Sequence, residues 1–245
     1  MSCGRAGSYL RSMTSSPVTI SPVRRSWRAA PATPDPPLVI PRREPVLRLV
    51  ATRAGLILTA GLLLGGLTSW GQTVLPAAVA PFANSASGWT IVAVLLLWRI
   101  RGGPAASAFY GALAFSGLDL GYAMVSTARG YFYDPTFWLV VALTAGPVVG
   151  AAVSLARGRA SILAAAGCGV LLGLVAGDGI YGLAVVAGST GPVYWTAAVV
   201  AALAGLIAST WRLRSAPRGL VVLWGTGILV AAVYPSGLLL LGSLM

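Results

Sequence analysis

The sequence predicts an all-α bundle of seven membrane-spanning helices, with six spans as the nearest alternative. Residues 46–245 are dominated by Ala, Gly, Leu and Val, and 57% of all residues are hydrophobic while 9% are charged. This composition is typical of a membrane protein rather than of a soluble core. Most apolar segments approach the roughly 20 residues that a spanning helix needs. Arginine-bearing loops alternate with loops that nearly lack basic residues, as the positive-inside rule predicts for a multi-spanning chain.

Two regions follow from this composition. Residues 1–45 are rich in Ser, Pro and Arg and contain no apolar run long enough for a helix. We predict a disordered cytoplasmic tail there, since such a segment buries too little apolar surface to fold. It is not a secretory signal, because no apolar stretch follows its arginines before the next basic cluster. Residues 46–245 form the predicted transmembrane domain.

The predicted spans differ in quality. The first, 47–70, carries small residues at intervals that let a second helix backbone approach, notably Gly55, Gly61 and Gly65. We expect packing within the chain, with a partner-binding face as the alternative. The other well-defined spans are expected at 104–127, 136–156, 160–181 with an extension to 187, 193–211 and 219–242. Gly146-Pro147 and Tyr234-Pro235 are expected to kink two of them.

The segment 71–88 fits neither a loop nor a span. It has no charge and contains Pro76 and Pro81, and the apolar run after it, 89–98, is too short for a full crossing. We expect an outer-side loop that dips into the protein, with Asn84 or Ser85 capping the second helix. A loop that lies flat on the membrane is the alternative.

The arginine pattern also predicts orientation and partners. It places the N-terminus in the cytoplasm and the C-terminus outside a cell membrane. The formal net charge of +12 comes from arginines in the tail and at helix ends. We therefore expect contact with the lipid bilayer and no nucleic-acid partner.

Two acids lie inside predicted spans, and they are the clearest candidates for a binding site. Asp119 and Asp178 each precede a tyrosine by three residues, Tyr122 and Tyr181, which places acid and tyrosine on one helical face. Intramembrane carboxylates usually face the protein interior or a wet cavity. The predicted topology brings both pairs to the outer half of the bundle. The alternative is a carboxyl group that only joins two helices by hydrogen bonding.

The ligand-binding hypothesis adds two further residues at the same predicted level, Asn84 and Trp89. The two acids also belong to similar hairpins, each running from an arginine pair through acid, tyrosine and an aromatic pair to a second arginine pair. This layout is consistent with a parallel repeat, as found in transporter folds. Positive flanks and aromatic belts place Arg and Trp similarly in any hairpin, which is the simpler explanation.

The sequence lacks the residues of several catalytic chemistries. It contains no His and no Lys, which excludes Ser–His and Ser–Lys nucleophile pairs. Its two cysteines, Cys3 and Cys168, are expected at different membrane levels, so we predict no disulfide. With no His and no cluster of Cys, we predict no metal and no other cofactor. Two carboxylates could form an aspartyl dyad, but Ala-Gly-Asp178-Gly is only a partial match to intramembrane aspartyl proteases. We predict no catalytic residues.

Several short motifs resemble a known family. They are Leu67-Thr68-Ser69, Ala83-Asn84-Ser85 with Trp89, and Phe137-Trp138 followed by Gly146-Pro147 and Gly150. Over about residues 55–215 the chain resembles an uncharacterised family of small actinobacterial multi-spanning membrane proteins, which implies the fold and no activity. Its layout is also similar to that of the substrate-capturing membrane subunits of vitamin uptake systems.

Two functions from different classes remain open at this point. The first is a membrane protein that binds or transports a small solute through an outer-facing polar pocket. The second is a structural or assembly subunit of a membrane complex, with a partner membrane subunit and no ligand. If Asp119 and Asp178 share one pocket, the effects of changing each to Asn should be non-additive.

Overall fold

The computed structural model describes residues 43–159 and 161–242, and within these ranges it is helical with no strand. The elements are α1 (Arg43–Val74), η1 (Ala80–Asn84), α2 (Ala86–Trp98), α3 (Pro104–Ala128), α4 (Thr136–Ala156), α5 (Ile162–Tyr181), η2 (Gly182–Val186), α6 (Ala187–Thr190), α7 (Val193–Leu213) and α8 (Pro217–Gly242). The predicted all-α bundle is confirmed. The predicted tail lies outside the described residues, except for the first residues of α1.

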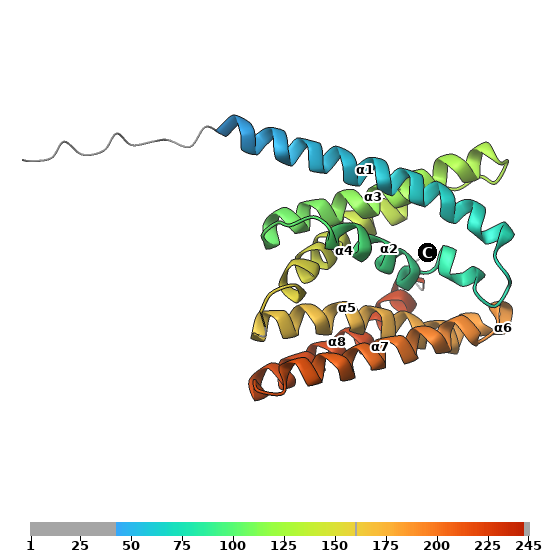
Figure 1. Cartoon of the computed structure of the whole chain (residues 1–245). Helices are drawn as coiled ribbons and strands as arrows, with labels where there is room; N and C mark the ends of the chain where they lie inside the picture. Colours follow the sequence, from blue (N-terminus) through green and yellow to red (C-terminus); the bar gives the residue numbers. More distant parts are fainter. Residues whose placement is uncertain (1–42, 160, 243–245) are drawn as a thin grey trace, which may run out of the picture. The chain divides into compact units, whose positions relative to one another are not determined.

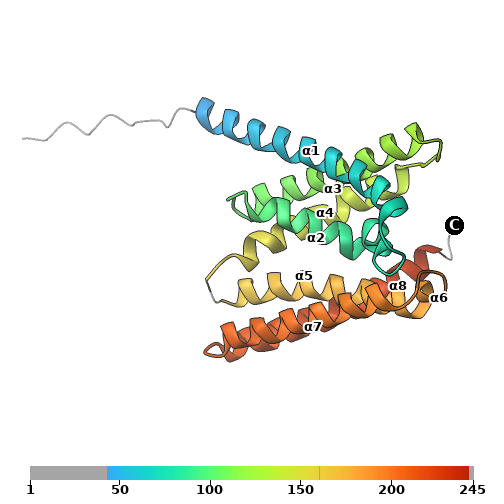
Figure 2. The ribbon, with the colours of Figure 1, turned by 45° about the vertical axis from the view of Figure 1, so that its right-hand side comes forward.

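Six stretches of helix are long and apolar enough to cross a membrane, and α2 is not one of them. Its 13 residues extend about 20 Å, against a hydrocarbon core of about 30 Å. Figures 1 and 2 show α1 and α3 running in the same direction, with α2 beside them running back toward the start of α3. The return passage therefore consists of the segment 75–85 together with α2. The six long helices, together with the passage formed by the segment 75–85 and α2, correspond to the seven predicted spans.

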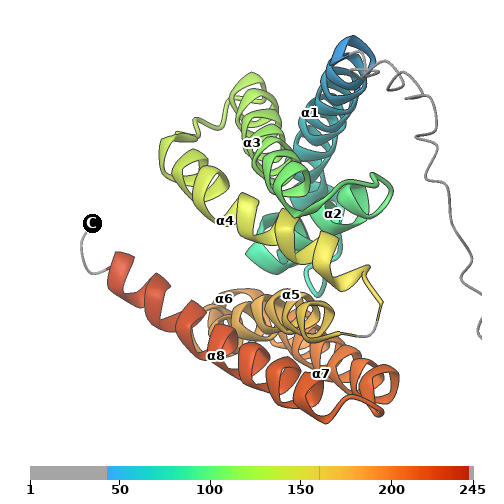
Figure 3. The same cartoon turned by 90° about the vertical axis from the view of Figure 1, so that its left-hand side faces the viewer.

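The helices form two packed groups. The first has α3 at its centre, with α1 and α4 against it, and the second has α5 at its centre, with α7 and α8 against it. Figure 3 shows the two groups separately, and α4 and α5 make the longest contact between them. Each group has its own buried cluster, one around Tyr110, Leu118 and Val153 and the other around Ala165, Leu206 and Leu223.

Glycines decide which helices lie in closest contact. A Cβ placed on Gly65 of α1 would collide with the Leu118 carbonyl of α3, and one on Gly121 of α3 would collide with the Leu62 carbonyl of α1. On α5, Gly173 and Gly177 leave no room for a side chain against α8. Small residues at this spacing allow helix backbones to approach closely. The expected packing within the chain is thus observed at Gly65, whereas Gly55 has no neighbour within 4 Å.

The segment before α2 enters the protein, as expected. Pro81, Ala83 and Ser85 are buried, and η1 packs against α1, α2 and α7. Ser85 is the cap of α2, since its Oγ accepts a hydrogen bond from the Gly88 amide at 3.0 Å. Of the two predicted capping residues, Ser85 is therefore the one that caps, and Asn84 is exposed.

Prolines, a π turn and a glycine turn mark irregular points in the long helices. Pro147 and Pro235 both lie inside continuous helices. At Gly182 the fifth helix changes from α to π geometry and then continues as α6. Such π turns often occur at functional positions. The chain turns into α7 at Gly191, whose φ of 77° favours glycine.

Large apolar side chains are exposed along the outward faces of the long helices. Examples are Leu63 at 66% exposure, Leu143 at 62% and Val221 at 74%. Burying such surface in lipid removes the cost of exposing it to water. This exposure suggests contact with a bilayer, in agreement with the predicted lipid partner.

Candidate functional site

Asp178 lies at the centre of a hydrogen-bonded cluster between α2, α5 and α8. Its Oδ2 accepts from the Ser87 amide at 2.8 Å and from the Ser87 hydroxyl at 2.5 Å. Its Oδ1 accepts from the Tyr234 hydroxyl at 2.9 Å. The residue is only 4% exposed. A carboxylate offers about four acceptor positions, so three donors leave capacity for about one more.

Local structure explains how these donors reach Asp178. Ser87 lies in the first turn of α2, where backbone amides have no partner within the helix, and Ser85 ends the preceding segment so that this turn faces α5. Tyr234 comes close because Gly177 carries no side chain, and a Cβ there would lie 3.0 Å from that of Tyr234. The Tyr194 hydroxyl of α7 lies 2.7 Å from Ser85 Oγ and 2.8 Å from Ser87 Oγ, which fixes both serines.

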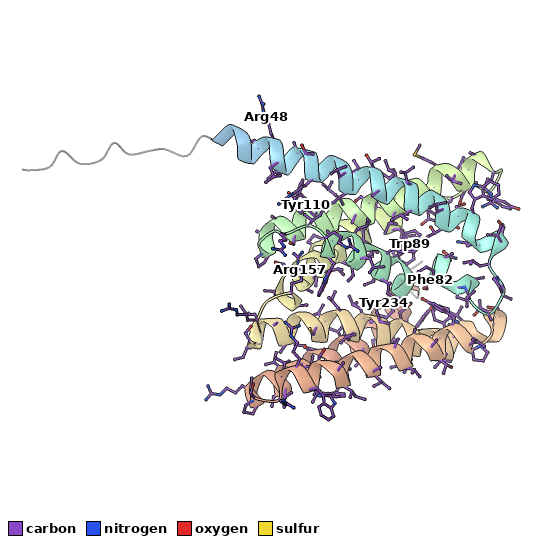
Figure 4. The ribbon with its side chains drawn as sticks, in the orientation of Figure 1. Arg48, Phe82, Trp89, Tyr110, Arg157 and Tyr234 are labelled. Carbon is purple, nitrogen blue, oxygen red and sulfur yellow. The ribbon has the colours of Figure 1, made fainter. Side chains whose placement is uncertain are left out.

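Asp178 lines a cavity of about 820 Å³, called here the Asp178 cavity. Its walls come from the end of α1, the segment 77–86, α4, α5 to α7, and α8; the lining includes Gln72, Pro81, Asn84, Ser85, Trp138, Asp178, Tyr181, Thr190, Trp195 and Tyr234. In Figure 4, Phe82, Trp89 and Tyr234 lie in the region between the two helix groups. Small-molecule sites occupy roughly 300–1,000 Å³, so the volume is that of a ligand site.

An apolar groove of about 510 Å³ continues from this cavity. It runs between α4 and α8 and is lined by Phe115, Phe137, Val141, Val149, Leu229 and Val233, among others. Trp138 and Tyr234 line both the groove and the Asp178 cavity. The Asp178 cavity, with one carboxyl group in a mostly apolar lining, thus adjoins an apolar groove.

Asp119 belongs to a separate cluster between α3 and the turn after it. It is 1% exposed, and its Oδ1 accepts a hydrogen bond from the Tyr133 hydroxyl at 2.9 Å. Its Oδ2 has no hydrogen-bond partner among the described residues. Burial raises the pKa of Tyr133 well above its ordinary value, and the Asp119 carboxyl acts in the same direction, so the phenol remains a donor. Asp119 does not line the Asp178 cavity.

The other predicted site residues divide between the two clusters. Tyr181 and Asn84 line the Asp178 cavity, and Tyr181 makes no hydrogen bond to Asp178. Tyr122 lies beside Trp89 and Tyr133, at ring-centroid distances of 5.7 and 4.8 Å. Its hydroxyl accepts from Gln72, which lines the cavity. Trp89 and Asn84 line a small space of about 40 Å³ next to the cavity.

Arg129, in the turn after α3, makes no hydrogen bond to either acid. It donates to the Ser69 carbonyl at 2.5 Å and to the Thr73 hydroxyl at 3.2 Å, and it lies 4.6 Å from the Trp70 ring centroid. These contacts join the turn after α3 to the end of α1. Arg129 is therefore a structural link and not a counter-charge for the site.

Sequence reasoning missed the serine and the two tyrosines that bond the acids, Ser87, Tyr133 and Tyr234, and also Tyr194, which bonds Ser85 and Ser87. In the sequence, Ser87 is only one residue of an uncharged loop, and Tyr234 is only the residue before a kinking proline. Tyr133 and Tyr194 are typical of an outer turn and of an aromatic belt. One signal is present, since tyrosine hydroxyls in apolar spans need a buried partner and carboxylates are the strongest acceptors.

The two hairpins, α3–α4 and α5–α7, differ in how their acids are held. The partner of Asp119 comes from its own turn, whereas the partners of Asp178 come from α2 and α8, outside the hairpin. That the two hairpins form a true parallel repeat stays a prediction. The described residues contain no group of three His, Cys, Asp or Glu side chains able to hold a metal ion.

These features define a class, a helical integral membrane protein with a cavity between two helix groups that one buried carboxyl group lines. The chain belongs to the family described as "Family of unknown function (DUF6518)", which it matches over residues 44–243. The match extends from α1 to α8, so it includes the last helix, which the expected resemblance left out. No curated protein and no solved structure matches the chain.

Proposed function

We propose that this membrane protein binds a small amphipathic solute, whose hydrogen-bond-donating or cationic group faces Asp178 and whose apolar part lies in the groove between α4 and α8. The observation that carries the proposal is a carboxylate at the wall of an 820 Å³ cavity that adjoins the apolar groove and shares Trp138 and Tyr234 with it. Ligand sites commonly combine apolar walls with a few placed polar groups.

Charge supports the choice of solute class. All protein contacts to Asp178 come from donors, and no arginine lines the cavity. A carboxylate with no cationic partner, at a wall of low polarity, attracts a cation or a donor and repels an anion. Aromatic rings of Trp138, Tyr181 and Trp195 also line the cavity, and such faces favour cations.

The competing function is a structural or assembly subunit without a ligand. The Asp119 cluster favours it, because that acid is fully buried and does not line the Asp178 cavity. In that case the Asp178 cavity would be filled by lipid or by a partner subunit. A binding experiment separates the two functions.

The solute class is tested with three probes that share one chain and differ in head group: hexylammonium, hexanol and hexanoate. We expect hexylammonium to raise the melting temperature of the purified protein more than the other two, because a ligand that binds only the folded state stabilises it. At ten times its Kd the gain is about 1.4 kcal/mol. Asp178→Asn should remove the preference for the ammonium probe.

Two matched pairs serve as controls. Asp119→Asn changes a buried acid that does not line the cavity and should leave the preference intact. Ser189→Trp should block the cavity, which Ser189 lines, whereas Ser236→Trp changes another exposed helical serine that does not line it. Equal stabilisation by all three probes, or equal loss in both members of a pair, would exclude the proposed solute class.

We further propose that the N-terminus is cytoplasmic, the C-terminus is outside and the Asp178 cavity opens on the outer side of the cell membrane. Arginines support this orientation. Those at the ends of α2, α4 and α7 lie on the side where α1 begins, and Arg129 lies on the other side. An excess of arginine marks the cytoplasmic side.

The orientation is tested by reporter fusions. A reporter after Met245 should be active only as an external reporter, and one within residues 1–40 only as a cytoplasmic reporter. The composite passage of η1 and α2 is what makes the number of crossings odd. If both termini were found on the same side of the membrane, η1 and α2 would not form a crossing. The proposed outer position of the cavity would then be contradicted as well.

A further inference from the structure

A second cavity, of about 660 Å³, lies where α2, α4 and α7 end. It is called here the arginine cavity, and it is lined by Trp98, Arg99, Arg101, Gly102, Ser154, Arg157, Gly158 and Arg212. Four of these eight residues are arginines. Nothing in the solute-binding proposal uses this cavity, which lies at the opposite end of the long helices from the Asp178 cavity.

Two of the arginines are fixed in place by backbone carbonyls. Arg157 Nη1 donates to the carbonyls of Trp98 and Ile100 at 3.1 and 2.6 Å. Arg212 donates through both Nη atoms to the last carbonyls of the α4 end, at 3.2 and 2.5 Å. The final carbonyls of a helix lack partners within it, so these arginines close two helix ends. Arg157 still has free donors, because a guanidinium carries five N–H groups.

The other two arginines have no acceptor among the described residues. Arg99 and Arg101 are exposed, and no ion pair involves either of them in the described part. Three carboxylates among the side chains that the structure describes, Asp119, Asp134 and Asp178, are bonded to Tyr133, Thr136 and the Ser87–Tyr234 pair. Burial, together with the neighbouring Arg101 guanidinium, lowers the pKa of Arg157. The cavity thus gathers four arginines, and no Asp or Glu is among the described residues that line it.

The positive-inside rule explains arginines at this membrane side but not their convergence on one cavity. Arg48 and Arg218 lie at the same side, and neither lines the cavity. Figure 4 shows Arg48 directed away from the helices and Arg157 among the ends of α2 and α4. The convergence therefore calls for an explanation of its own.

The chemistry of the cavity identifies the missing partner. The planar guanidinium matches phosphate oxygens with two parallel hydrogen bonds, and it is the preferred group for phosphate recognition. Basic pockets between membrane helices on the cytoplasmic side bind phosphate-bearing lipid head groups. Trp98, which is 46% exposed at the rim, is a residue type enriched at head-group depth.

We propose that the arginine cavity binds a phosphate group, held by Arg99 and Arg101 and by the free donors of Arg157. The phosphate is carried either by an anionic phospholipid or by a soluble phosphate ester. Both sources present the same anionic oxygens to the same guanidinium groups. The site is separate from the solute site, so either can be tested without the other.

The test is native mass spectrometry of the full chain with three probes, dioctanoyl phosphatidylglycerol, dioctanoyl phosphatidylcholine and glycerol 1-phosphate. We compare Arg99→Gln/Arg101→Gln with the matched control Arg48→Gln/Arg218→Gln, which removes the same charge at the same side. We expect the cavity pair to weaken phosphate binding about tenfold or more, since it removes two charge-assisted contacts. The control pair should bind as the unchanged protein does.

The three probes also identify which kind of molecule carries the phosphate. Binding of phosphatidylglycerol without glycerol 1-phosphate assigns the site to a lipid head group, and binding of both at similar concentrations assigns it to a soluble phosphate ester. In either case added salt must weaken binding in the unchanged protein, which tests the ionic contact without any variant. Equal affinity in the two double variants, no preference for phosphatidylglycerol or glycerol 1-phosphate over phosphatidylcholine, or no salt effect would each overturn the proposal.

Discussion

Replacing Gly65 by Ala is expected to destabilise the protein by about 2 kcal/mol or more, the cost of overpacking a tight helix contact. The added methyl group would collide with the Leu118 carbonyl of α3, and backbone cannot move aside as a flexible side chain does. The α1–α3 contact would have to open along its length, because Gly121 meets Leu62 in the same way one turn further on. The measurement is thermal unfolding of the purified protein in detergent.

Gly55→Ala is the matched control for this change. Gly55 lies on the same helix, and a methyl group added there would have nothing within 4 Å, so the change should be neutral or stabilise by up to about 1 kcal/mol through helix propensity. Equal effects at Gly55 and Gly65 would contradict the observed α1–α3 contact. They would instead favour a partner-binding role for this face.

Replacing Asp178 by Ala is expected to cost about 2–4 kcal/mol, because it leaves the Ser87 amide, the Ser87 hydroxyl and the Tyr234 hydroxyl buried without an acceptor. Asp119→Ala should cost less, about 0.5–1.5 kcal/mol, since only the Tyr133 hydroxyl loses its partner. Both changes remove the same atoms, and thermal unfolding in detergent measures both costs. The difference between the two costs therefore reflects how many hydrogen-bond donors lose their acceptor, because the substitution itself is the same.

The double variant tests whether the acids act together. No residue hydrogen-bonded to Asp119 is also bonded to Asp178, so the two costs should add within about 0.5 kcal/mol. A strongly non-additive result would restore the shared pocket that the sequence pattern favoured. A larger cost at Asp119 than at Asp178 would contradict the hydrogen-bond assignment of both clusters.

How far the sequence predicts this protein differs between its fold and its site. The long helices follow from apolar runs near 20 residues, and their bounds agree with prediction closely at 136–156 and less so at the first helix, which begins at Arg43. The second helix could not be bounded in the same way, because a short helix preceded by a buried segment has no hydropathy signature of its own. Ser85 was predictable as a cap because an uncharged hydroxyl residue precedes an apolar run.

The sequence by itself determined the helical membrane class, the positions of the long apolar helices and the two buried acids as the polar residues of interest. These properties depend on composition and on residue spacing within one segment, so the local sequence is enough to predict them. Only the tertiary structure decided that Asp178 lines a cavity while Asp119 does not, and that Ser87 and Tyr234, 91 and 56 residues away from Asp178, hold it. Those outcomes depend on which helices pack together. Close glycine contacts such as that of Gly177 with Tyr234 set this packing, and the sequence does not show which residue faces a given glycine.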